Sequence, residues 1–238
     1  MRNIASAIEQ YNTHVCHNRS HNVRAWVGCT AQITTGAQIP IGRDVSHYLT
    51  RVMRTTKCLV FGDGNEYSAE LSPDGVSLRV LERTAHTDPS NDLTLIFSPI
   101  KRMDDLLNMA TQMGVAYFQP VIMSRTVAHH INWSRMHKIV IEAAEQSNRN
   151  SIPKILPEKK FQDLDLSNII FADERCAHTQ TTSGVDFNSK FIMIGPEGGF
   201  SESEFNALDS AGAHSLSLGK TILRAEVASI VAISKVLK

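Results

Sequence analysis

The chain has 238 residues, of which 42% are hydrophobic, and its 24 basic and 24 acidic side chains give a net charge of zero. This length suits one large domain or two modest ones. No apolar run approaches the ~20 residues needed to span a membrane, and a neutral chain is not held to nucleic acid by bulk charge alone.

The charge is unevenly distributed along the chain. Residues 1–57 carry seven Lys or Arg against two acids, a balance of +5, and the remainder carries −5. A basic N-terminal part is expected to sit on phosphates. An ordinary solvated basic face explains the counts equally well.

The cysteines and the N-terminus indicate a cytoplasmic protein. The N-terminus lacks the continuous apolar segment of a signal peptide. The four cysteines lie far apart with no C-x-x-C pair, which is typical of reduced thiols. No second ligand cluster accompanies His14, His17 and His21, so no metal site is predicted. The cysteines are Cys16, Cys29, Cys58 and Cys176.

The first 88 residues are predicted to be rich in β-structure. Apolar runs separated by Gly, Pro and Asp turns predict strands at 23–27, 57–61, 66–71 and 76–81. A short helix at 46–54 would place His47, Arg51 and Arg54 on adjacent faces. Short strands at this spacing suggest a small barrel. A polar segment at 84–91 is the predicted linker, giving domains at 1–88 and 89–238.

After the linker, strands and helices alternate. This pattern favours an α/β fold with a parallel sheet. Arg125 follows one of these strands, and Arg149 ends a segment that begins in a helix. The predicted strands are 93–97, 115–122 and 168–172, and the predicted helices are 101–113 and 133–147.

Residues 191–232 carry the most information. A strand at 191–194 runs into Gly195-Pro196-Glu197-Gly198-Gly199, and Ser201 with Glu204 forms a capping box that starts a helix ended by Gly212. A strand at 216–218 and a turn at Gly219 then lead to a last helix at 222–237. Two glycine loops at corresponding strand ends predict one pocket.

Acidic residues in and after the first loop select the kind of ligand. Glu197, Glu202 and Glu204 make a poor cradle for a pyrophosphate, although glycine loops before helices usually bind anions. A neutral or cationic ligand with its own carboxylate fits better. For the first loop alone, a tight turn that only joins strand to helix is equally expected; the second loop favours a pocket.

Three motifs resemble those of a known family. The segments 194–201, 216–219 and 222–226, read as IGPEGGFS, LSLG and ILRAE, resemble the signature of the RsmE ribosomal RNA methyltransferases of the SPOUT superfamily. Residues 142–150 match that family's E-A-x-E-Q-x-x-R segment, and His47-x-x-x-Arg51-Val52-Met53-Arg54 resembles its RNA-contacting motif. The resemblance covers roughly residues 44–238, and the first forty match nothing recognised.

The resemblance implies a fold, a reaction and a set of residues. The fold would be a SPOUT parallel sheet with a trefoil knot, preceded by a PUA-like β-barrel. The reaction would be transfer of a methyl group from S-adenosylmethionine to N3 of a uridine in small-subunit ribosomal RNA. The cofactor would contact Gly195, Glu197, Gly198, Gly199, Leu218, Gly219, Leu223 and Arg224. Phosphates would contact His47, Arg51, Arg54 and Lys57.

Methylation at N3 requires the nitrogen to lose its proton, because protonated N3 is not nucleophilic. Arg125 and Arg149 are the candidate cations for a negatively charged uracil oxygen. Glu226 is the candidate acceptor nearby, although an ion pair with Arg224 is the slightly favoured role for it. No general base is assigned.

Other functions fit less well. Residues 217–221 mimic the end of a P-loop, but His214 stands where that motif needs glycine, and no G-x-G-x-x-G is present. The sequence also departs from the family: Thr221 replaces a common Arg, and R-T-E-T reads Arg224-Ala225-Glu226-Val227. A binding scaffold that has lost catalysis therefore remains the alternative.

The last predicted helix also indicates an assembly. Its apolar residues spread around more than one face. We expect a two-fold homodimer packed through this helix, with the uridine site completed by the partner.

Overall fold

The computed structural model describes residues 14–17, 23–28, 32–89, 91–127, 131–178 and 189–237. Their contacts divide the chain into two compact units. The first unit is Met1–Ser90 together with Ser134–Ile152, and the second is Asn91–Trp133 together with Pro153–Lys238. None of the described helices is long and apolar enough to cross a membrane.

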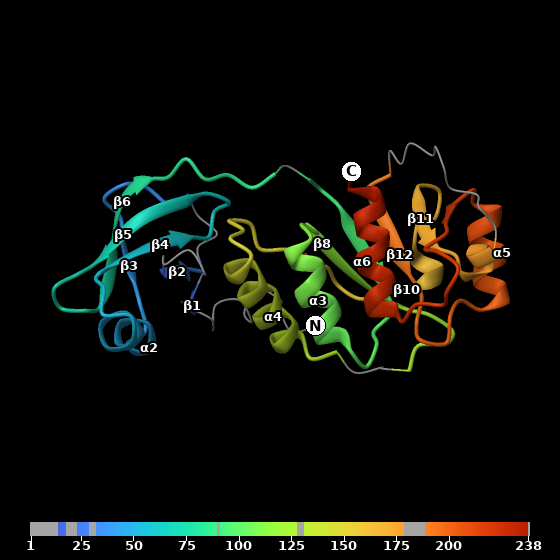
Figure 1. Cartoon of the computed structure of the whole chain (residues 1–238), viewed down its shortest axis with the longest axis horizontal. Coiled ribbons are helices and arrows are strands. Elements are labelled where there is room, and N and C mark those ends of the chain that lie inside the picture. The colour runs from blue at the N-terminus through green and yellow to red at the C-terminus, as the bar shows by residue number, and fades with distance from the viewer. Residues whose placement is uncertain are drawn as a thin grey trace. The chain divides into compact units, whose positions relative to one another are not determined.

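The first unit is built on a mixed six-stranded sheet that curls around its core (Figure 1). The strand order is β1-β2-β4-β5-β6-β3, and all neighbours are antiparallel except β2 and β4. Alternate strand residues face a core that includes Val60, Ala69 and Leu78. The strands are β1 (His14–His17), β2 (Val23–Trp26), β3 (Gln38–Pro40), β4 (Lys57–Phe61), β5 (Glu66–Leu71) and β6 (Ser77–Arg83).

Two helical segments complete this unit. The helix predicted at 46–54 is instead a short α2 (Arg43–His47) that continues into a π-helical turn, η1 (Tyr48–Val52). Two residues after this turn, Arg54 has a φ of 52°, which is unusual for a residue with a side chain. The helix α4 (Trp133–Gln146) contributes Ile141 to a small core with Trp26 and Phe61.

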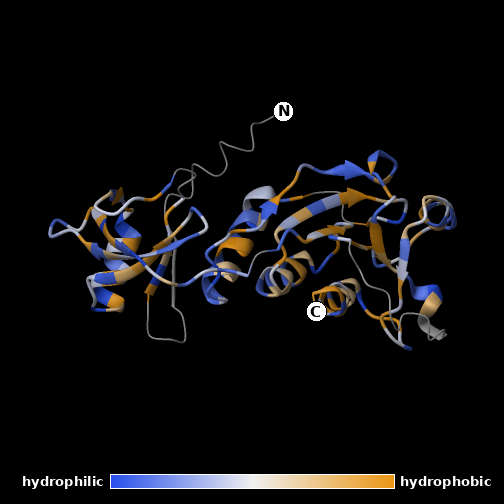
Figure 2. Ribbon diagram, turned by 90° about the horizontal axis from the view of Figure 1, so that it is seen from above, coloured by the Kyte–Doolittle hydropathy of each residue, from blue (hydrophilic) through white to orange (hydrophobic). Residues whose placement is uncertain are grey.

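The second unit contains a parallel sheet, as the alternating pattern predicted. The order is β10-β8-β7-β12-β11-β13, with β9 also beside β8, and every pair is parallel. The strands are β7 (Thr94–Phe97), β8 (Tyr117–Ile122), β9 (Lys154–Ile155), β10 (Lys159–Lys160), β11 (Ile169–Ala172), β12 (Phe191–Ile194) and β13 (His214–Leu216). Figure 2 shows hydrophobic residues along several of these strands.

Three helices pack on the second sheet. The helix α5 (Glu202–Ser210) brings Phe205 and Leu208 onto a core with Met193. The helix α3 (Met103–Gln112) packs against α6 (Ala225–Val236), and α6 packs against β12. The predicted capping box of α5 is confirmed: the Ser201 side chain accepts from the Glu204 N–H, and the Glu204 carboxylate accepts from the Ser201 N–H. Short 3-10 turns are η2 (Phe161–Asp163) and η3 (Glu174–His178).

Two predicted boundaries near the C-terminus are wrong by two to three residues. Strand β13 ends at Leu216, which pairs with Ala172, the last residue of β11, and the chain then leaves the sheet. Helix α6 begins at Ala225 because Arg224 is extended, with φ −66° and ψ 152°. Residues 217–224 are therefore a loop, longer than the sequence pattern suggested.

Candidate functional site

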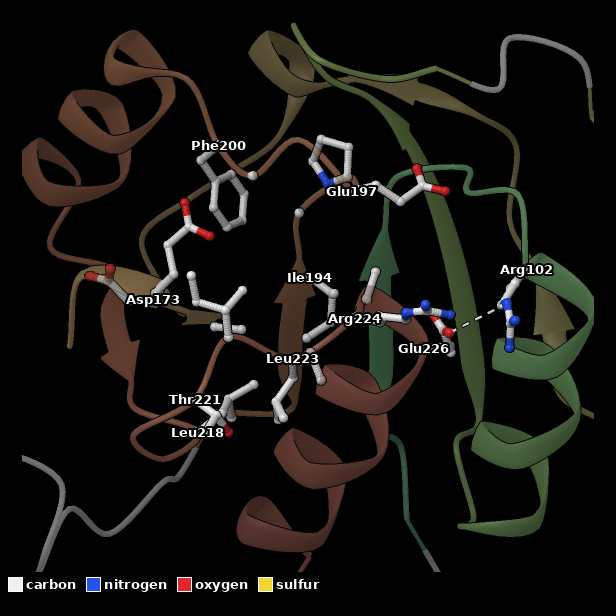
Figure 3. A pocket seen from close by; sticks show the side chains of 18 of the residues that line it. Arg102, Asp173, Ile194, Glu197, Phe200, Leu218, Thr221, Leu223, Arg224 and Glu226 are labelled. Carbon is white, nitrogen blue, oxygen red and sulfur yellow. Dashed lines mark ion pairs between the residues drawn. The ribbon is translucent and has the colours of Figure 1, made fainter. Parts of the chain in front are cut away.

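A cavity of about 530 Å³ lies in the second unit at the carboxyl ends of the parallel strands (Figure 3). It lies where the strand order reverses, because β8 is on one side of β7 and the later strands β12, β11 and β13 are on the other. Crevices at such points are the usual ligand sites of parallel sheets, and this volume is within the usual range of small-molecule pockets. The lining comes from Lys101, Arg102, Val127, Ala172, Asp173, Glu174, residues 194–197, Gly199, Phe200, Leu218, Gly219, residues 221–226 and Ala228.

The first glycine loop forms one wall of the cavity. Gly199 donates its N–H to the Pro196 carbonyl (2.9 Å) and adopts a φ of +70°. A Cβ at Gly199 would lie 2.6 Å from Glu174 Oε1, and one at Gly195 would lie 3.2 Å from the Phe200 ring. The backbone angle therefore favours glycine at Gly199, and a Cβ there would force the end of the Glu174 side chain to move.

Gly198 faces away from the cavity, toward Arg125. It is not among the lining residues, and a Cβ there would lie 3.3 Å from the Arg125 Cβ. The Arg125 Nη1 donates to the carbonyls of Gly198 (2.9 Å) and Phe200 (3.1 Å). Arg125 thus holds the loop from outside. On the other side, Glu197 Oε1 accepts the N–H of Lys101 at 3.0 Å.

The second loop, residues 217–224, forms the opposite wall. Leu218 and Leu223 give it apolar surface, and Gly219 adopts a φ of +127°. The loop is held at its start, because the Ser217 carbonyl accepts from Lys235 Nζ (2.9 Å) and the Ser217 hydroxyl donates to the Cys176 carbonyl. The Ile222 side chain remains 82% exposed at the cavity.

Glu226 lines the cavity but does not pair with Arg224. Its side chain is 7% exposed, and its ion-pair partner is Arg102, whose Nε lies 3.8 Å from Glu226 Oε1. Figure 3 shows this pair beside the labelled Arg224. Arg102 was not among the predicted site residues. Its place between a strand end and the start of α3 was the available signal.

Asp173 and Glu174 were also missed, although they directly follow a predicted strand. Asp173 is buried and accepts from Arg175, which also pairs with Asp209 on α5 and stacks on the Phe205 ring. Hydrogen bonds to Asp173 and Asp209 raise the pKa of Arg175. This cluster fixes the turn that places Glu174 at the cavity.

Arg149 lies in the first unit, in a densely hydrogen-bonded segment. Its carbonyl accepts from Arg24 Nη1 (3.2 Å), its own Nη2 donates to Ser151 Oγ (3.2 Å), and burial lowers its pKa. The neighbouring Asn150 accepts from Arg24 Nη2 at 2.6 Å, and Asp88 accepts the N–H groups of Asn150 and Ser151. The segment 142–150 thus docks α4 on the sheet of its own unit.

The four predicted RNA-contacting residues are gathered around α2 and η1 in the first unit. All of them are exposed, and no ion pair within the described residues engages any of them. Exposed basic side chains without acidic partners are available to phosphates. These residues are His47, Arg51, Arg54 and Lys57.

The chemistry of the cavity fits an amphiphilic cation. Ile194, Leu218 and Leu223 provide apolar walls for a flat ring, while carboxylates can accept from hydroxyl and ammonium groups. S-adenosylmethionine combines such a ring with a ribose diol, an ammonium and a sulfonium, so the residues present fit it. The lining carboxylates are Asp173, Glu174, Glu197 and Glu226. The described residues contain no group of three or more side chains suited to a metal ion.

Comparisons with known proteins agree with this chemistry. The profile of a family described as "RNA methyltransferase domain" matches residues 87–237. The chain is 33% identical over 207 residues to the ribosomal RNA small subunit methyltransferase E of Rickettsia conorii, covering 80% of this chain and 85% of that protein. It is 29% identical over 234 residues to the protein of the same name from Bacillus subtilis, covering 86% and 91%.

A solved structure is similar over most of the chain. It is the crystal structure of a ribosomal RNA small subunit methyltransferase E from Neisseria gonorrhoeae bound to S-adenosyl methionine. The TM-score is 0.73 at 27% identity, and the match covers 89% of this chain and 95% of that one.

Proposed function

This chain belongs to the family of ribosomal RNA small subunit methyltransferases E, and from that premise we propose that it methylates N3 of a uridine in small-subunit ribosomal RNA. The observation that carries the proposal is the cavity in the second unit, whose two glycine loops, together with Asp173, Glu174 and Glu197, suit S-adenosylmethionine. The cofactor supplies the methyl group, which is activated by its bond to a positively charged sulfur.

We propose that the two glycine loops hold the cofactor. Leu218, Gly219 and Leu223 would contact the adenine ring through backbone groups and apolar surface. Gly195, Glu197, Gly199 and Arg224 would border the ribose and the methionine part, with Gly198 keeping the loop in place through its carbonyl bond to Arg125. Because Glu197 also accepts the Lys101 N–H, it ties the first loop to the start of α3.

The substrate needs charge stabilisation and a path for its proton. Guanidinium groups stabilise the negative charge that develops on uracil oxygens, since such preorganised donors cost no reorganisation during the reaction. We assign this role to Arg149, and we assign to Glu226 the acceptance of the N3 proton. Arg125, the other cation predicted for this role, would contribute by holding the first glycine loop in place. Glu226 suits that role because its buried carboxylate lines the cavity.

RNA binding is assigned to the N-terminal domain. Residues 1–88 would form a PUA-like RNA-binding domain, on which the 134–152 segment packs, and residues 89–238 would form the SPOUT methyltransferase domain with a trefoil knot. Phosphate contacts by His47, Arg51, Arg54 and Lys57 would position the RNA without reading its sequence. The exposure of all four side chains supports this.

We further propose a two-fold homodimer that works in the cytoplasm. Helix α6 leaves Val227 43% exposed, and the adjoining loop leaves Ile222 82% exposed, so apolar surface remains next to the cavity. A partner packed through α6 would cover this surface. Arg149 of the partner subunit would then complete the uridine site.

The test combines cofactor binding with product analysis. Calorimetry should show that S-adenosylmethionine binds the chain. Small subunits from cells that lack this modification should then gain one methyl group, which digestion and mass spectrometry should identify as N3-methyluridine. Cofactor binding without methyl transfer would favour a catalytically impaired scaffold, and methylation of another atom would refute the N3 assignment.

A further inference from the structure

The ion pair between Arg102 and Glu226 leaves most of its hydrogen-bonding capacity unused. No hydrogen bond from another described residue reaches the Glu226 carboxylate, whose side chain is 7% exposed. The 3.8 Å separation from Arg102 Nε exceeds ordinary hydrogen-bond lengths. Glu226 lines the cavity, so a ligand there can supply the donors that the carboxylate lacks. In a ligand cavity, such a group is therefore suited to accept a hydrogen from the ligand.

Arg102 likewise makes only long contacts with its two acidic neighbours. Its side chain is 59% exposed, and its second acidic neighbour, Asp105, is 3.9 Å away on the surface. The guanidinium has five N–H donors, and neither contact fixes them. Arg125, in contrast, has one nitrogen committed to two carbonyls and does not line the cavity.

Other charged groups lie near the pair at the cavity. Glu226 occupies the first turn of α6, where the helix dipole favours a carboxylate. Lys101 and Arg224 add positive charge along the same wall of the cavity. The lining acid on the first loop, Glu197, accepts the Lys101 N–H and is exposed.

We propose that Arg102 and Glu226 together bind the edge of the target uracil through hydrogen bonds. Glu226 accepts the hydrogen of N3, and Arg102 donates to the neighbouring carbonyl oxygen, O4. This inference rests on the proposed function and adds to it a catalytic arginine that belongs to the same unit as the cavity.

The step balances as follows. The N3–H bond breaks, its proton passes to a carboxylate oxygen of Glu226, and the electron pair stays on the ring, where O4 carries part of the negative charge beside Arg102. N3 then forms the bond to the methyl carbon while the carbon–sulfur bond breaks and leaves its electron pair on sulfur. The proton and the methyl group occupy the same direction at N3, so proton removal comes first.

The pair also discriminates between pyrimidines. Uracil presents an acceptor at O4 beside a donor at N3, which complements a guanidinium beside a carboxylate. Cytosine presents an amino donor beside a bare N3 acceptor, so each group would face one of its own kind. Sites built for hydrogen bonds reject mismatched partners strongly, because buried polar groups are left unpaired.

The experiment compares Arg102→Ala, Arg102→Lys and Glu226→Gln with a matched control, Lys159→Ala, an exposed cation on β10 outside the cavity. Removing Arg102 should lower the single-turnover methylation rate by about 10²–10³-fold, the usual effect of losing one such donor. Lysine should restore part of the rate, and the control should match wild type. Calorimetry should show unchanged affinity for S-adenosylmethionine in all four variants.

Methylation of a more acidic substrate distinguishes a catalytic role of Arg102 from a purely structural one, because a structural defect would lower the rate equally on both substrates. Small subunits from cells grown with 5-fluorouracil carry uridines whose N3 loses its proton more easily, because fluorine withdraws electrons. The defect of Arg102→Ala should shrink on this substrate by at least about threefold, since less help is needed to form the anion. The rising limb of its pH–rate profile on normal subunits should also move to higher pH.

Three outcomes would overturn the inference. Loss of cofactor affinity in Arg102→Ala or Glu226→Gln would place the pair in the cofactor site instead. A wild-type rate in Arg102→Ala, or the same defect on normal and fluorinated subunits, would remove Arg102 from the reaction. An inactive wild-type protein would instead count against the proposed function itself.

Discussion

Arg24 shows how a single residue organises the first unit. Its guanidinium is fully buried, 3.0 Å from Glu66, 2.6 Å from Asn150 Oδ1 and 4.4 Å from the centre of the Phe61 ring. Burial lowers its pKa, and the Glu66 charge counteracts that effect. A buried cation is tolerated only when its partners satisfy it. The segment 142–150 thus supplies hydrogen-bond acceptors for the buried Arg24, namely the Arg149 carbonyl and Asn150 Oδ1.

Arg24→Ala should destabilise the protein by about 3–5 kcal/mol, because it leaves the buried Glu66 without its cation. Urea unfolding followed by circular dichroism measures this change. The control is Arg79→Ala, which removes an exposed arginine paired loosely with Glu70 in the same sheet and should cost no more than about 0.5 kcal/mol. Equal effects of the two substitutions would contradict the role assigned to Arg24.

We expect Cys58 to make the stability of the protein depend on pH. Burial raises the pKa of its thiol to about 12. The unfolded thiol ionises near pH ~8.5, so between these values the native state keeps a proton that the unfolded state has lost. Stability is therefore fully present below the unfolded value and falls as the pH rises toward 12.

Cys58→Ala should remove this part of the pH dependence. Between pH 8 and 10 the wild-type protein should lose about 1–2 kcal/mol more stability than the variant does. Urea unfolding at several pH values measures the difference, and Cys176→Ala, at a partly exposed site, is the control. Parallel curves for wild type and Cys58→Ala would refute the prediction.

At the scale of elements, the first glycine loop depends on a positive φ at Gly199 and on the contacts of that residue. Gly199 and Gly212 both end or interrupt a chain turn with nearly the same φ, +70° and +71°. A Cβ on Gly199 would meet Glu174 at 2.6 Å, whereas nothing lies within 4 Å of a Cβ on Gly212. The two glycines therefore share a backbone angle that disfavours other residues, but only at Gly199 would an added Cβ meet a residue of the cavity wall.

Gly199→Ala and Gly212→Ala should both lower stability by about 1 kcal/mol, since alanine disfavours a positive φ. Only Gly199→Ala should weaken binding of S-adenosylmethionine, because Glu174 must move within the cavity wall. Calorimetry compares the two affinities. Equal affinities in both variants would show that this loop does not contact the ligand.

At the scale of the whole molecule, the proposed dimer divides one active site between two chains. Gly199→Val should abolish cofactor binding because a β-branched residue is strongly disfavoured at this φ. Arg149→Ala should leave the cofactor bound but remove the guanidinium offered to the partner subunit. Each homodimer should be inactive.

Mixing the two variants tests the shared site. After exchange of subunits, the heterodimer should regain one working site, so the mixture should approach about a quarter of wild-type activity if subunits pair at random. Methyl incorporation into small subunits measures the recovery, and sedimentation reports the dimer. A fully active monomer, or no recovery after proven exchange, would contradict the proposal.

The sequence by itself determined the local elements and the ligand loops. Strands β4, β5 and β12 match their predicted bounds, since short apolar runs end at clear turn residues. The capping box set the start of α5 because its two hydrogen bonds join residues only three apart. Seven of the eight predicted cofactor residues line one cavity, because the carboxyl ends of parallel strands meet at one edge of a sheet.

Only the tertiary structure decided which charged groups meet. Arg102 and Glu226 lie more than 100 residues apart in sequence, and no periodicity relates them, so the sequence favoured the nearer Arg224 as a partner. Likewise, Arg24 finds Glu66 and Asn150 only after α4 packs on the first sheet. Local patterns record backbone geometry and burial, whereas ion pairs depend on how distant elements pack, and that arrangement is fixed by the whole chain at once.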